Sequence, residues 1–476
     1  MNKFSLAKVI CLVFVVCTAT AICCPAQTFS TISNFNSFNG SDPFGTLAQG
    51  LNGDFYSTTL GGGANSDGTV FLVTPTGTLT VRHSFDKTDG SAPNSGVVLG
   101  ADRNFYGVTQ GGGANNQGTI FKITPSGHLT TLYSFCPLAG CADGDDPQGT
   151  LVEATNGNFY GTTYGGGPNN VGTIFEISRT GTFTSLHSFC SEANCADGEI
   201  PQQGLVQANN GNLYGTAPYG GTNSGGVIYQ LTPSGTFSVI YSFCAQTNCA
   251  DGSTPYAALI LAANGNLYGT TAGGGTNNNG TVFEVTTAGQ LTTLYTFCPN
   301  TGCADGANPE GPLVQATDGK LYGMTFAGGA NGKGAIFAIT PSGTFTTLYS
   351  FCSQTSCDDG EGPYLTGLLQ ATNGTLYGTT PQGGNKTYGT VFSLAVGLGP
   401  FVKTVPTAGR VGAAVTILGN GLTGTTAVSF NGTAATFTVV SDTEITTTVP
   451  TGATTGRVQV TTPTGTLNSN VRFRVL

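Results

Sequence analysis

A tyrosine motif returns seven times along this chain of 476 residues, and this repetition limits the possible folds more than any other pattern in the sequence. The intervals between motif tyrosines are 50, 54, 54, 54, 54 and 55 residues, for Tyr56, Tyr106, Tyr160, Tyr214, Tyr268, Tyr322 and Tyr377. Such a period is typical of solenoids, propellers and other arrays in which one small unit is repeated. We number the repeats 1 to 7 by these tyrosines.

Each repeat contains four runs with the composition of β-strands, which we call runs A to D. In repeat 3 they cover residues 150–154, 159–163, 173–177 and 183–189. They are rich in β-branched and aromatic residues, and an Asn-Gly hairpin signal separates runs A and B. A tight turn follows run C, whereas the B–C loop and the loop from D to the next A are longer. This alternation predicts a propeller blade with a turn face, carrying the A–B and C–D turns, and a loop face, carrying the B–C and D–A loops.

The two ends of the array complement each other. Repeat 7 lacks run D, whereas residues 28–35 match the run D of repeat 6 at residues 344–351. The N-terminal strand would complete the last blade and close the ring, and closure removes the exposed strand edges of an open array. The sequence therefore predicts an all-β chain whose residues 27–397 form a seven-bladed β-propeller, with four-stranded repeats of about 54 residues and a ring closed by the N-terminal strand.

The N-terminus has the pattern of a secretory signal peptide, because two lysines precede a short apolar run. We place cleavage after Ala26, so that residues 1–26 are removed, and lipid attachment at Cys23 or Cys24 is the alternative. No later stretch is long and apolar enough to predict a transmembrane helix. We therefore expect a secreted, extracellular or cell-surface protein.

Composition excludes several other classes of protein. Charged residues are only 8% and hydrophobic residues 38%, which argues against a disordered polyelectrolyte. The 74 glycines have no three-residue period, so the chain is not a collagen. Removing residues 1–26 leaves 13 basic and 24 acidic residues, a net charge of −11. We expect no nucleic-acid partner, because an acidic chain without a run of basic residues lacks the clustered positive charge that binds phosphates.

Three elements of the repeat recur together: Asn-Gly-Asn-Leu-Tyr-Gly-Thr, as in residues 264–270, then Gly-Gly-Gly, then Gly-Thr-Val-Phe. With these elements the region from 28 to 395 resembles the GloVer tandem-repeat family of secreted bacterial proteins. The resemblance implies a secreted repeat protein, and the family has no reaction that could be carried over to this chain.

Residues 400–476 form a different unit, in which the tyrosine motif stops and short Val/Thr strands begin. With Val-Thr-Ile-Leu-Gly-Asn-Gly-Leu at 415–422, Val-Ser-Phe-Asn-Gly at 428–432 and Val-Gln-Val-Thr-Thr-Pro at 458–463, this tail resembles an IPT/TIG domain. The resemblance implies an immunoglobulin-like β-sandwich that serves as a spacer or contact module.

Ten cysteines of the mature chain form five pairs with four residues between partners, each pair in a D–A loop. They are Cys136 and Cys141, Cys190 and Cys195, Cys244 and Cys249, Cys298 and Cys303, and Cys352 and Cys357. Export and the even number in each loop predict local disulfides, whereas a zinc site would need four ligands.

An Asp-Gly pair lies near the end of most D–A loops. Its simplest interpretation is a turn, in which Asp bonds the backbone and Gly supplies a positive φ. The alternative is a ring of carboxylates that collects Ca²⁺, which prefers oxygen ligands. The densest candidates for such a metal site are Asp143, Asp145, Asp146, Asp358 and Asp359.

The B–C loops contain further candidate ligand-binding residues. Their asparagines tolerate left-handed backbone and could also bind sugar hydroxyls; they are Asn115, Asn169, Asn223, Asn277 and Asn331. Tyr164, Tyr219 and Phe326 stand just before the glycines of these loops. We expect the motif tyrosines, in contrast, to be core residues of run B.

The sequence contains no recognisable catalytic constellation. His83 and His187 stand where other repeats have tyrosine, and no two carboxylates are placed by the sequence as a glycosidase pair. We therefore expect a non-enzymatic binding or scaffold protein whose loops recognise a glycan or a protein. An extracellular polysaccharide hydrolase or lyase, with Glu361 as one candidate acid, and a purely structural envelope protein are the alternatives.

Overall fold

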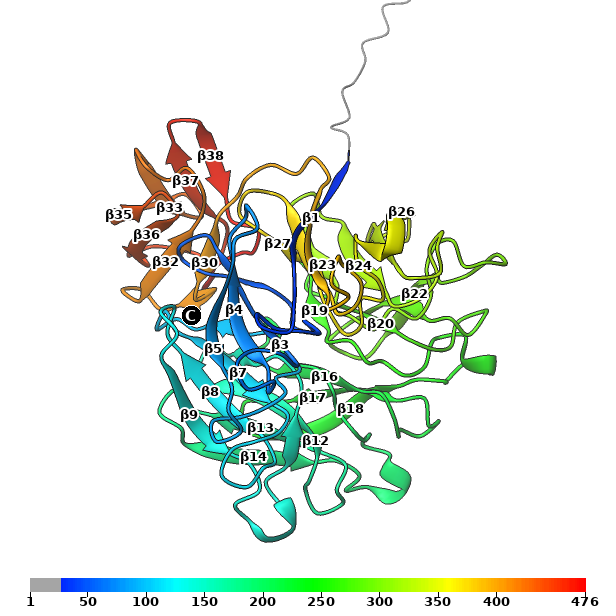
Figure 1. The fold of residues 1–476 in the computed structure, drawn as a ribbon. Coiled ribbons are helices and arrows are strands. Elements are labelled where there is room, and N and C mark those ends of the chain that lie inside the picture. Colours follow the sequence, from blue (N-terminus) through cyan, green and yellow to red (C-terminus); the bar gives the residue numbers. More distant parts are fainter. Residues whose placement is uncertain (1–26) are drawn as a thin grey trace, which may run out of the picture.

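The computed structural model describes residues 27–476, so the predicted signal peptide and the possible lipidation sites Cys23 and Cys24 lie outside the described residues. The described chain is almost entirely β-structure (Figure 1). Its helices are four short 3-10 turns, η1 (Ala139–Cys141), η2 (Ala193–Cys195), η3 (Thr247–Cys249) and η4 (Thr355–Cys357). No helix in residues 27–476 has the length and apolar character needed to cross a bilayer.

Repeats 1 to 6 each form one antiparallel sheet, with the strands in chain order except that two strands of repeat 3 share one neighbour. Repeats 1 and 2 contain β2 (Ala48–Gln49), β3 (Phe55–Thr59), β4 (Thr69–Val73), β5 (Leu79–Ser84), β6 (Val98–Leu99), β7 (Phe105–Thr109), β8 (Thr119–Ile123) and β9 (Leu129–Ser134). Repeat 3 contains an extra short strand, β10 (Asp145–Pro147), and then β11 (Val152–Glu153), β12 (Phe159–Gly165), β13 (Thr173–Ile177) and β14 (Phe183–Ser188).

Repeats 4 to 6 keep the same pattern. They contain β15 (Val206–Gln207), β16 (Leu213–Ala217), β17 (Val227–Leu231), β18 (Phe237–Ser242), β19 (Ile260–Leu261), β20 (Leu267–Thr271), β21 (Thr281–Val285), β22 (Leu291–Thr296), β23 (Val314–Gln315), β24 (Leu321–Thr325), β25 (Ala335–Ile339) and β26 (Phe345–Ser350).

Repeat 7 is completed by the N-terminal strand. It contains β27 (Leu369–Gln370), β28 (Leu376–Thr380) and β29 (Thr390–Ala395), and β1 (Thr28–Asn34) pairs antiparallel with β29. The register places Thr28 opposite Ala395 and Asn34 opposite Thr390. In the described chain the repeats thus give seven sheets, the last assembled from both ends of the array.

Buried side chains lie between neighbouring sheets, so that each sheet packs on the next. The motif tyrosines are buried there, as the sequence predicts, and Tyr106 stacks on Phe159 of the next repeat with ring centroids 3.9 Å apart. The same packing joins repeat 7 to repeat 1, where Phe55 and Tyr377 lie 4.3 Å apart and share one cluster of buried residues. Here the amide nitrogen of Thr372 also donates to Gln49 Oε1 at 3.0 Å.

Run A is shorter than the sequence predicts. The run 150–154 gives only β11, because the residues before it contact the next repeat instead of continuing the ladder. A Cβ atom at Gly149 would overlap the backbone of Gln203, so only glycine allows this approach. We call these stretches between the loop proline and strand A the inner segments.

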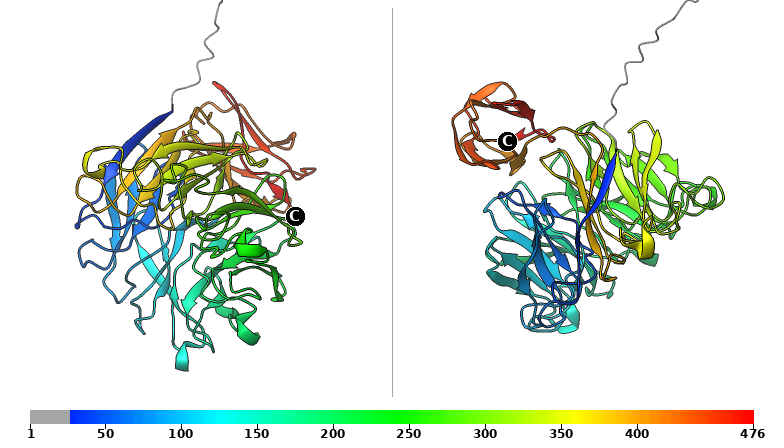
Figure 2. Two further views of the ribbon diagram at one scale, coloured as in Figure 1. Left: turned by 90° about the vertical axis from the view of Figure 1, so that its right-hand side faces the viewer. Right: turned by 45° about the horizontal axis from the view of Figure 1, so that its top comes forward.

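The tail contains two four-stranded sheets around one buried cluster and a further two-stranded parallel sheet. Its strands are β30 (Lys403–Val405), β31 (Ala408–Gly409), β32 (Ala414–Leu418), β33 (Ala427–Phe430), β34 (Thr433–Ala435), β35 (Phe437–Ser441), β36 (Glu444–Thr448), β37 (Val458–Thr462), β38 (Gly465–Asn468) and β39 (Arg474–Val475). Figure 2 shows it as a separate lobe beside the repeat sheets.

The tail contacts the turn face through A–B turns of several repeats. Thr443 Oγ1 donates to the carbonyl oxygen of Leu51 at 2.7 Å, and Arg103 forms an ion pair with Glu444 at 2.6 Å. Arg474 donates to the carbonyl oxygen of Asn209 at 2.8 Å. The tail therefore covers part of the turn face and leaves the loop face uncovered.

Candidate functional site

The loop face is held by disulfides in five of its D–A loops. The structure joins the two cysteines of each predicted pair, from Cys136 and Cys141 to Cys352 and Cys357. The D–A loops that lead into repeats 1 and 2 have no cysteines. The disulfides therefore fasten individual loops and are not a condition for forming a repeat sheet.

The aspartates of the Asp-Gly turns fasten the same loops from inside. Asp197 is fully buried and accepts hydrogen bonds from the amide nitrogen and the hydroxyl of Ser191 at 3.0 and 2.8 Å, while His187 Nε2 lies 3.2 Å away. In four other repeats a tyrosine hydroxyl takes the place of the histidine, in the pairs Tyr133 and Asp143, Tyr241 and Asp251, Tyr295 and Asp305, and Tyr349 and Asp359. We call these pairs the loop clasps, and they favour the turn interpretation of the aspartates.

The clasps shift the ionisation of their members. Burial, together with the hydrogen bond to the carboxylate, raises the pKa of each clasp tyrosine well above its usual value. Burial lowers the pKa of His187, against the opposing effect of Asp197. These groups are therefore neutral donors to a carboxylate, an arrangement that stabilises the loop.

Within residues 27–476, no three of the proposed calcium ligands form a close group of ligand atoms. Asp143 and Asp359 are used in clasps, and Asp146 accepts from Gln110 and Gln148 at 3.3 and 3.2 Å. Burial raises the pKa values of Asp145 and Asp146, which disfavours their charged forms. Within the described residues the carboxylates of Asp145 and Asp358 likewise belong to no group of three close ligand atoms.

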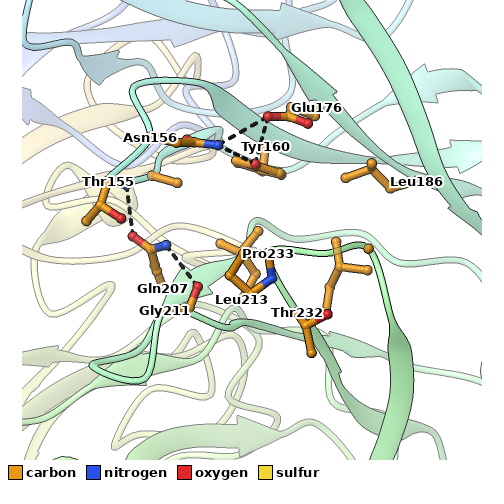
Figure 3. A pocket seen from close by; sticks show the side chains of 13 residues that line it. Thr155, Asn156, Tyr160, Glu176, Leu186, Gln207, Gly211, Leu213, Thr232 and Pro233 are labelled. Carbon is orange, nitrogen blue, oxygen red and sulfur yellow. Dashed lines mark hydrogen bonds between the residues drawn. The ribbon is translucent and has the colours of Figure 1, made fainter.

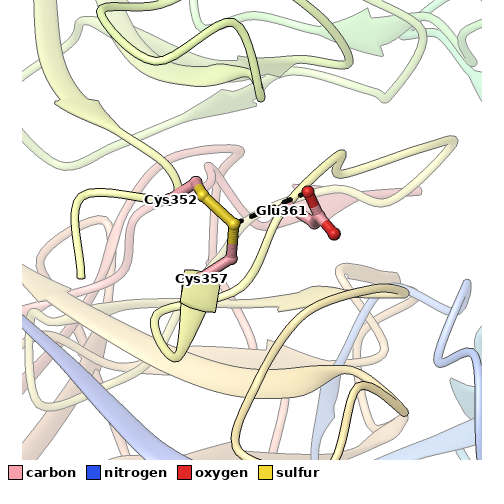
Figure 4. Close-up of side chains that lie close together, drawn as sticks. All are labelled: Cys352, Cys357 and Glu361. Carbon is pink, nitrogen blue, oxygen red and sulfur yellow. Dashed lines mark hydrogen bonds between the residues drawn. A yellow bond between two sulfur atoms is a disulfide. The ribbon is translucent and has the colours of Figure 1, made fainter. Parts of the chain in front are cut away.

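The described residues contain one group of three potential ligand atoms, formed by Cys352, Cys357 and Glu361 (Figure 4). Its two sulfurs are bonded to each other in a disulfide and are not thiolates. Glu361 also forms an ion pair with Lys333 at 2.6 Å. These three side chains therefore stabilise a D–A loop and do not form a metal site.

The asparagines of the B–C loops also have structural partners. In repeats 2 and 6, Asn115 and Asn331 donate from Nδ2 to the carbonyl oxygens of Phe135 and Phe351 at 2.9 and 3.0 Å. The equivalent residues Asn169, Asn223 and Asn277 bond to backbone carbonyls at the end of the adjoining strand D in the same way. These bonds tie the B–C loop to strand D, so each of these amides uses at least one N–H donor within the fold.

A small pocket of about 100 Å³ lies between repeats 3 and 4 on the turn face (Figure 3). Its polar groups bond to one another: the Tyr160 hydroxyl donates to Glu176 at 2.8 Å, and Gln207 accepts from the amide of Thr155 at 3.0 Å. Burial and the bond to Glu176 raise the pKa of Tyr160 to about 12. The pocket is small and its polar groups already have hydrogen-bond partners within the protein, so we do not regard it as a ligand site.

The inner segments bring one variable residue per repeat to the centre of the loop face. This residue follows the proline of each D–A loop, and we call the set the mouth residues: Phe44, Asn94, Gln148, Gln202, Tyr256, Glu310 and Tyr364. Threonines of strand B bond to the inner segment of the next repeat, as from Thr216 Oγ1 to Ala257 and from Thr379 Oγ1 to Gly45. The second bond passes from repeat 7 to repeat 1, so the contact between strand B and the next inner segment also joins these two repeats.

Aromatic side chains gather on one side of this mouth. Tyr364 lies between Phe44 and Phe326, with ring centroids at 5.8 and 5.6 Å. The hydroxyl groups of Tyr219 and Tyr256 are hydrogen-bonded to each other. Burial raises the pKa of Tyr364, and the nearby side chains of Glu310, Tyr219 and Tyr164 add to this rise. The structure thus brings Tyr164, Tyr219 and Phe326 together with mouth residues that the sequence analysis did not single out.

Two mouth residues carry buried polar atoms without partners in residues 27–476. The oxygens are Gln202 Oε1 and Glu310 Oε2, at equivalent positions in repeats 4 and 6. Glu310 is only 9% exposed, and burial raises the pKa of its carboxyl to about 7. Buried polar atoms of native proteins normally have a hydrogen-bond partner, so these two are suited to a partner from outside the chain.

The comparisons with known proteins concern the fold. The model of the Gloeobacter/Verrucomicrobia repeat matches residues 18–221 and 201–440. Virginiamycin B lyase from Staphylococcus aureus is similar in structure, with a TM-score of 0.51 and 14% identity over 78% of this chain and 98% of that one. The extracellular domain of a hybrid two-component system from B. thetaiotaomicron has a TM-score of 0.51 and 11% identity over 95% of this chain and 59% of that one. None of the curated proteins matches the chain in sequence. At these identities the neighbours show a propeller-like fold and carry no information on activity.

Proposed function

This chain belongs to the Gloeobacter/Verrucomicrobia repeat family, as its repeat motifs predict, and we propose that it is an extracellular, non-enzymatic propeller protein that binds a glycan at the mouth of its loop face. Extracellular location is supported by the signal-peptide pattern of residues 1–26 and by five local disulfides, which persist in oxidising compartments.

The proposal takes the seven repeat sheets as the blades of one closed ring. Its support is the pairing of β1 with β29 and the contacts between repeats 7 and 1 at Gln49, Thr372 and Tyr377. The tail would be an IPT/TIG-like module, consistent with its two-sheet sandwich. Because it contacts the A–B turns, ligand access from the loop face stays open.

The observation that carries the glycan assignment is the pair of buried, unpartnered oxygens of Gln202 and Glu310 in an aromatic mouth. Acceptors of this kind favour a ligand with many hydroxyl donors, since an unpaired buried polar atom costs about 1–3 kcal/mol. Tyr256 and Tyr364 offer ring faces for the apolar C–H face of a sugar ring. Binding sites typically combine such aromatic walls with a few placed polar groups.

A glycan array of the mature protein, residues 27–476, tests this proposal. We expect the wild-type protein to bind a restricted set of glycans, and Tyr364→Ala to lose this binding because it removes the ring between Phe44 and Phe326. The matched control is Glu361→Gln on the same face, whose carboxylate pairs with Lys333 and belongs to a D–A loop rather than to the mouth. Equal binding by wild type and Tyr364→Ala, or no binding by the wild type, would reject the glycan assignment.

One observation favours the alternative of a polysaccharide hydrolase or lyase. The carboxyl of Glu310 has a pKa of about 7 and is thus partly protonated at neutral pH, as a general acid must be. The causes of this shift include no neighbouring acid, so the mouth offers one candidate and not a glycosidase pair. Glu310→Gln distinguishes the two functions. If the protein only binds glycans, neither the wild type nor the variant forms a product. If it is an enzyme, the wild type forms a product, whereas the variant binds the glycan without forming one.

A further inference from the structure

A second cavity lies on the opposite side of the repeat array from the mouth. It has a volume of about 710 Å³ and is bounded by the inner strands β6, β11, β15 and β19 and by the tail. The tail contributes residues 404–408 together with Val471, Arg472 and Arg474. Its volume lies in the range of sites for small-molecule ligands, about 300–1,000 Å³.

The walls of this cavity are aliphatic. Val98, Val206 and Ile260 line it from the repeats, and Val405 and Val471 line it from the tail. No Phe or Tyr is among its lining residues in the described chain, in contrast to the mouth. Aliphatic walls without aromatic rings suit an alkyl chain better than a sugar or a flat ring system.

The charge of the cavity is opposite to that of the chain. Arg179, Arg472 and Arg474 and a single acid, Glu153, line it, while the whole protein has a net charge of −9. Glu153 is paired with Arg179, and Arg474 donates to backbone carbonyls of the turn at Asn209. Arg472 has no hydrogen-bond or ion-pair partner in the described residues, so its guanidinium is free for an anion.

We propose that this cavity binds a single-chain anionic amphiphile, such as a fatty acid, with its alkyl chain along the aliphatic walls and its carboxylate at Arg472. The inference is separate from the glycan proposal, because the cavity contains none of the seven mouth residues, although it also reaches inner-segment residues such as Thr46, Gln203 and Pro312. Apolar burial provides most of the affinity, and the guanidinium selects the sign of the head group.

Isothermal titration of the full mature chain with dodecanoate, below its micelle concentration, tests the inference. We expect saturable binding with one ligand per chain, and weaker binding of dodecyltrimethylammonium by about tenfold or more, since a charge-assisted hydrogen bond is lost and repulsion replaces it. Arg472→Glu should weaken dodecanoate binding by about tenfold or more for the same reason.

Two further variants separate the site from nonspecific effects. Lys386→Glu, an exposed charge reversal on the loop face, should leave dodecanoate binding unchanged. Val471→Asp puts a charge on the apolar wall at a side chain that is 51% exposed, so it should weaken binding without unfolding the tail. Absence of saturable dodecanoate binding, equal affinity for the cationic amphiphile, or full binding by Arg472→Glu would overturn the proposal.

Discussion

Glu310 differs from the other mouth residues because its side chain is an acid, and this acid is buried. The position after the loop proline holds aromatic or amide residues in the other six repeats, and only repeat 6 has an acid there. Burial at this position disfavours the charge of Glu310 and raises its pKa to about 7.

This shift makes a prediction about stability and pH. The folded protein holds a proton on Glu310 up to about pH 7, whereas the unfolded chain releases it near the ordinary glutamate pKa of 4.5. Between these values the native state binds more protons, so the free energy of unfolding falls as pH rises, by about 3 kcal/mol at most. Urea denaturation at pH 4.5 and pH 8 should show that Glu310→Gln removes this part of the pH dependence. An unchanged pH dependence in the variant, with Glu361→Gln as control, would mean that Glu310 is ionised in the fold.

The clasp residues show what sequence could and could not establish for single positions. The Asp-Gly turns are predictable, and they are confirmed as turns inside the D–A loops. For their partners on strand D, the sequence shows only that His83 and His187 occupy the position that holds tyrosine in other repeats. It does not show that these side chains contact the aspartates. The common property is a ring group that reaches the aspartate, as in the 2.6 Å contact between His83 Nε2 and Asp89.

Strands B, C and D follow closely from their residues, and strand A does not. In repeat 3 the predicted run 173–177 is strand β13 without change, because alternating contacts on both faces need β-branched and aromatic side chains. Run A is reduced to two residues because its first half contacts the next repeat through Gly149. Contacts between repeats are long-range, and the pattern within one repeat does not contain them.

The disulfide loops give a prediction for a single element. Replacing Cys244 and Cys249 by serine opens one loop of six residues and should lower the free energy of unfolding by about 2 kcal/mol or less. The sheet of repeat 5 should survive, because repeats 1 and 2 form without cysteines. Limited proteolysis should then cut the loop near Thr247 while the rest of the chain stays resistant. Global proteolysis of the variant would contradict the local role of the disulfide.

For the whole molecule, the seven repeats and the separate tail are predictable from the sequence, but the position of the proposed binding site at the mouth is not. The period indicates how many repeats there are, and the missing run D of repeat 7 indicates its N-terminal partner. One sequence pattern does mark the mouth residues: each follows the proline that all seven repeats share, and its identity varies between repeats. The place where the tail contacts the repeats has no comparable sequence pattern, because contacts such as the ion pair between Arg103 and Glu444 occur in one repeat only.

Closure of the ring can be tested by deleting residues 28–36. These include β1, whose Phe29 stacks on Tyr349 of repeat 6 at 3.8 Å and which covers the edge of β29. We expect a sharp fall in melting temperature, by more than about 10 °C, because one strand and its packing are lost from both the last sheet and its neighbour. A variant with an unchanged melting temperature would contradict closure by the N-terminal strand.

The place where a glycan binds can be measured directly by hydrogen–deuterium exchange, with and without a glycan that the array identifies. Binding at the mouth predicts slower exchange in the inner segments that follow Tyr256, Glu310 and Tyr364, together with the backbone near Tyr219, and no change in the tail. Slower exchange confined to the turn face or to the tail, with the inner segments unaffected, would contradict the assignment of the mouth as the binding site.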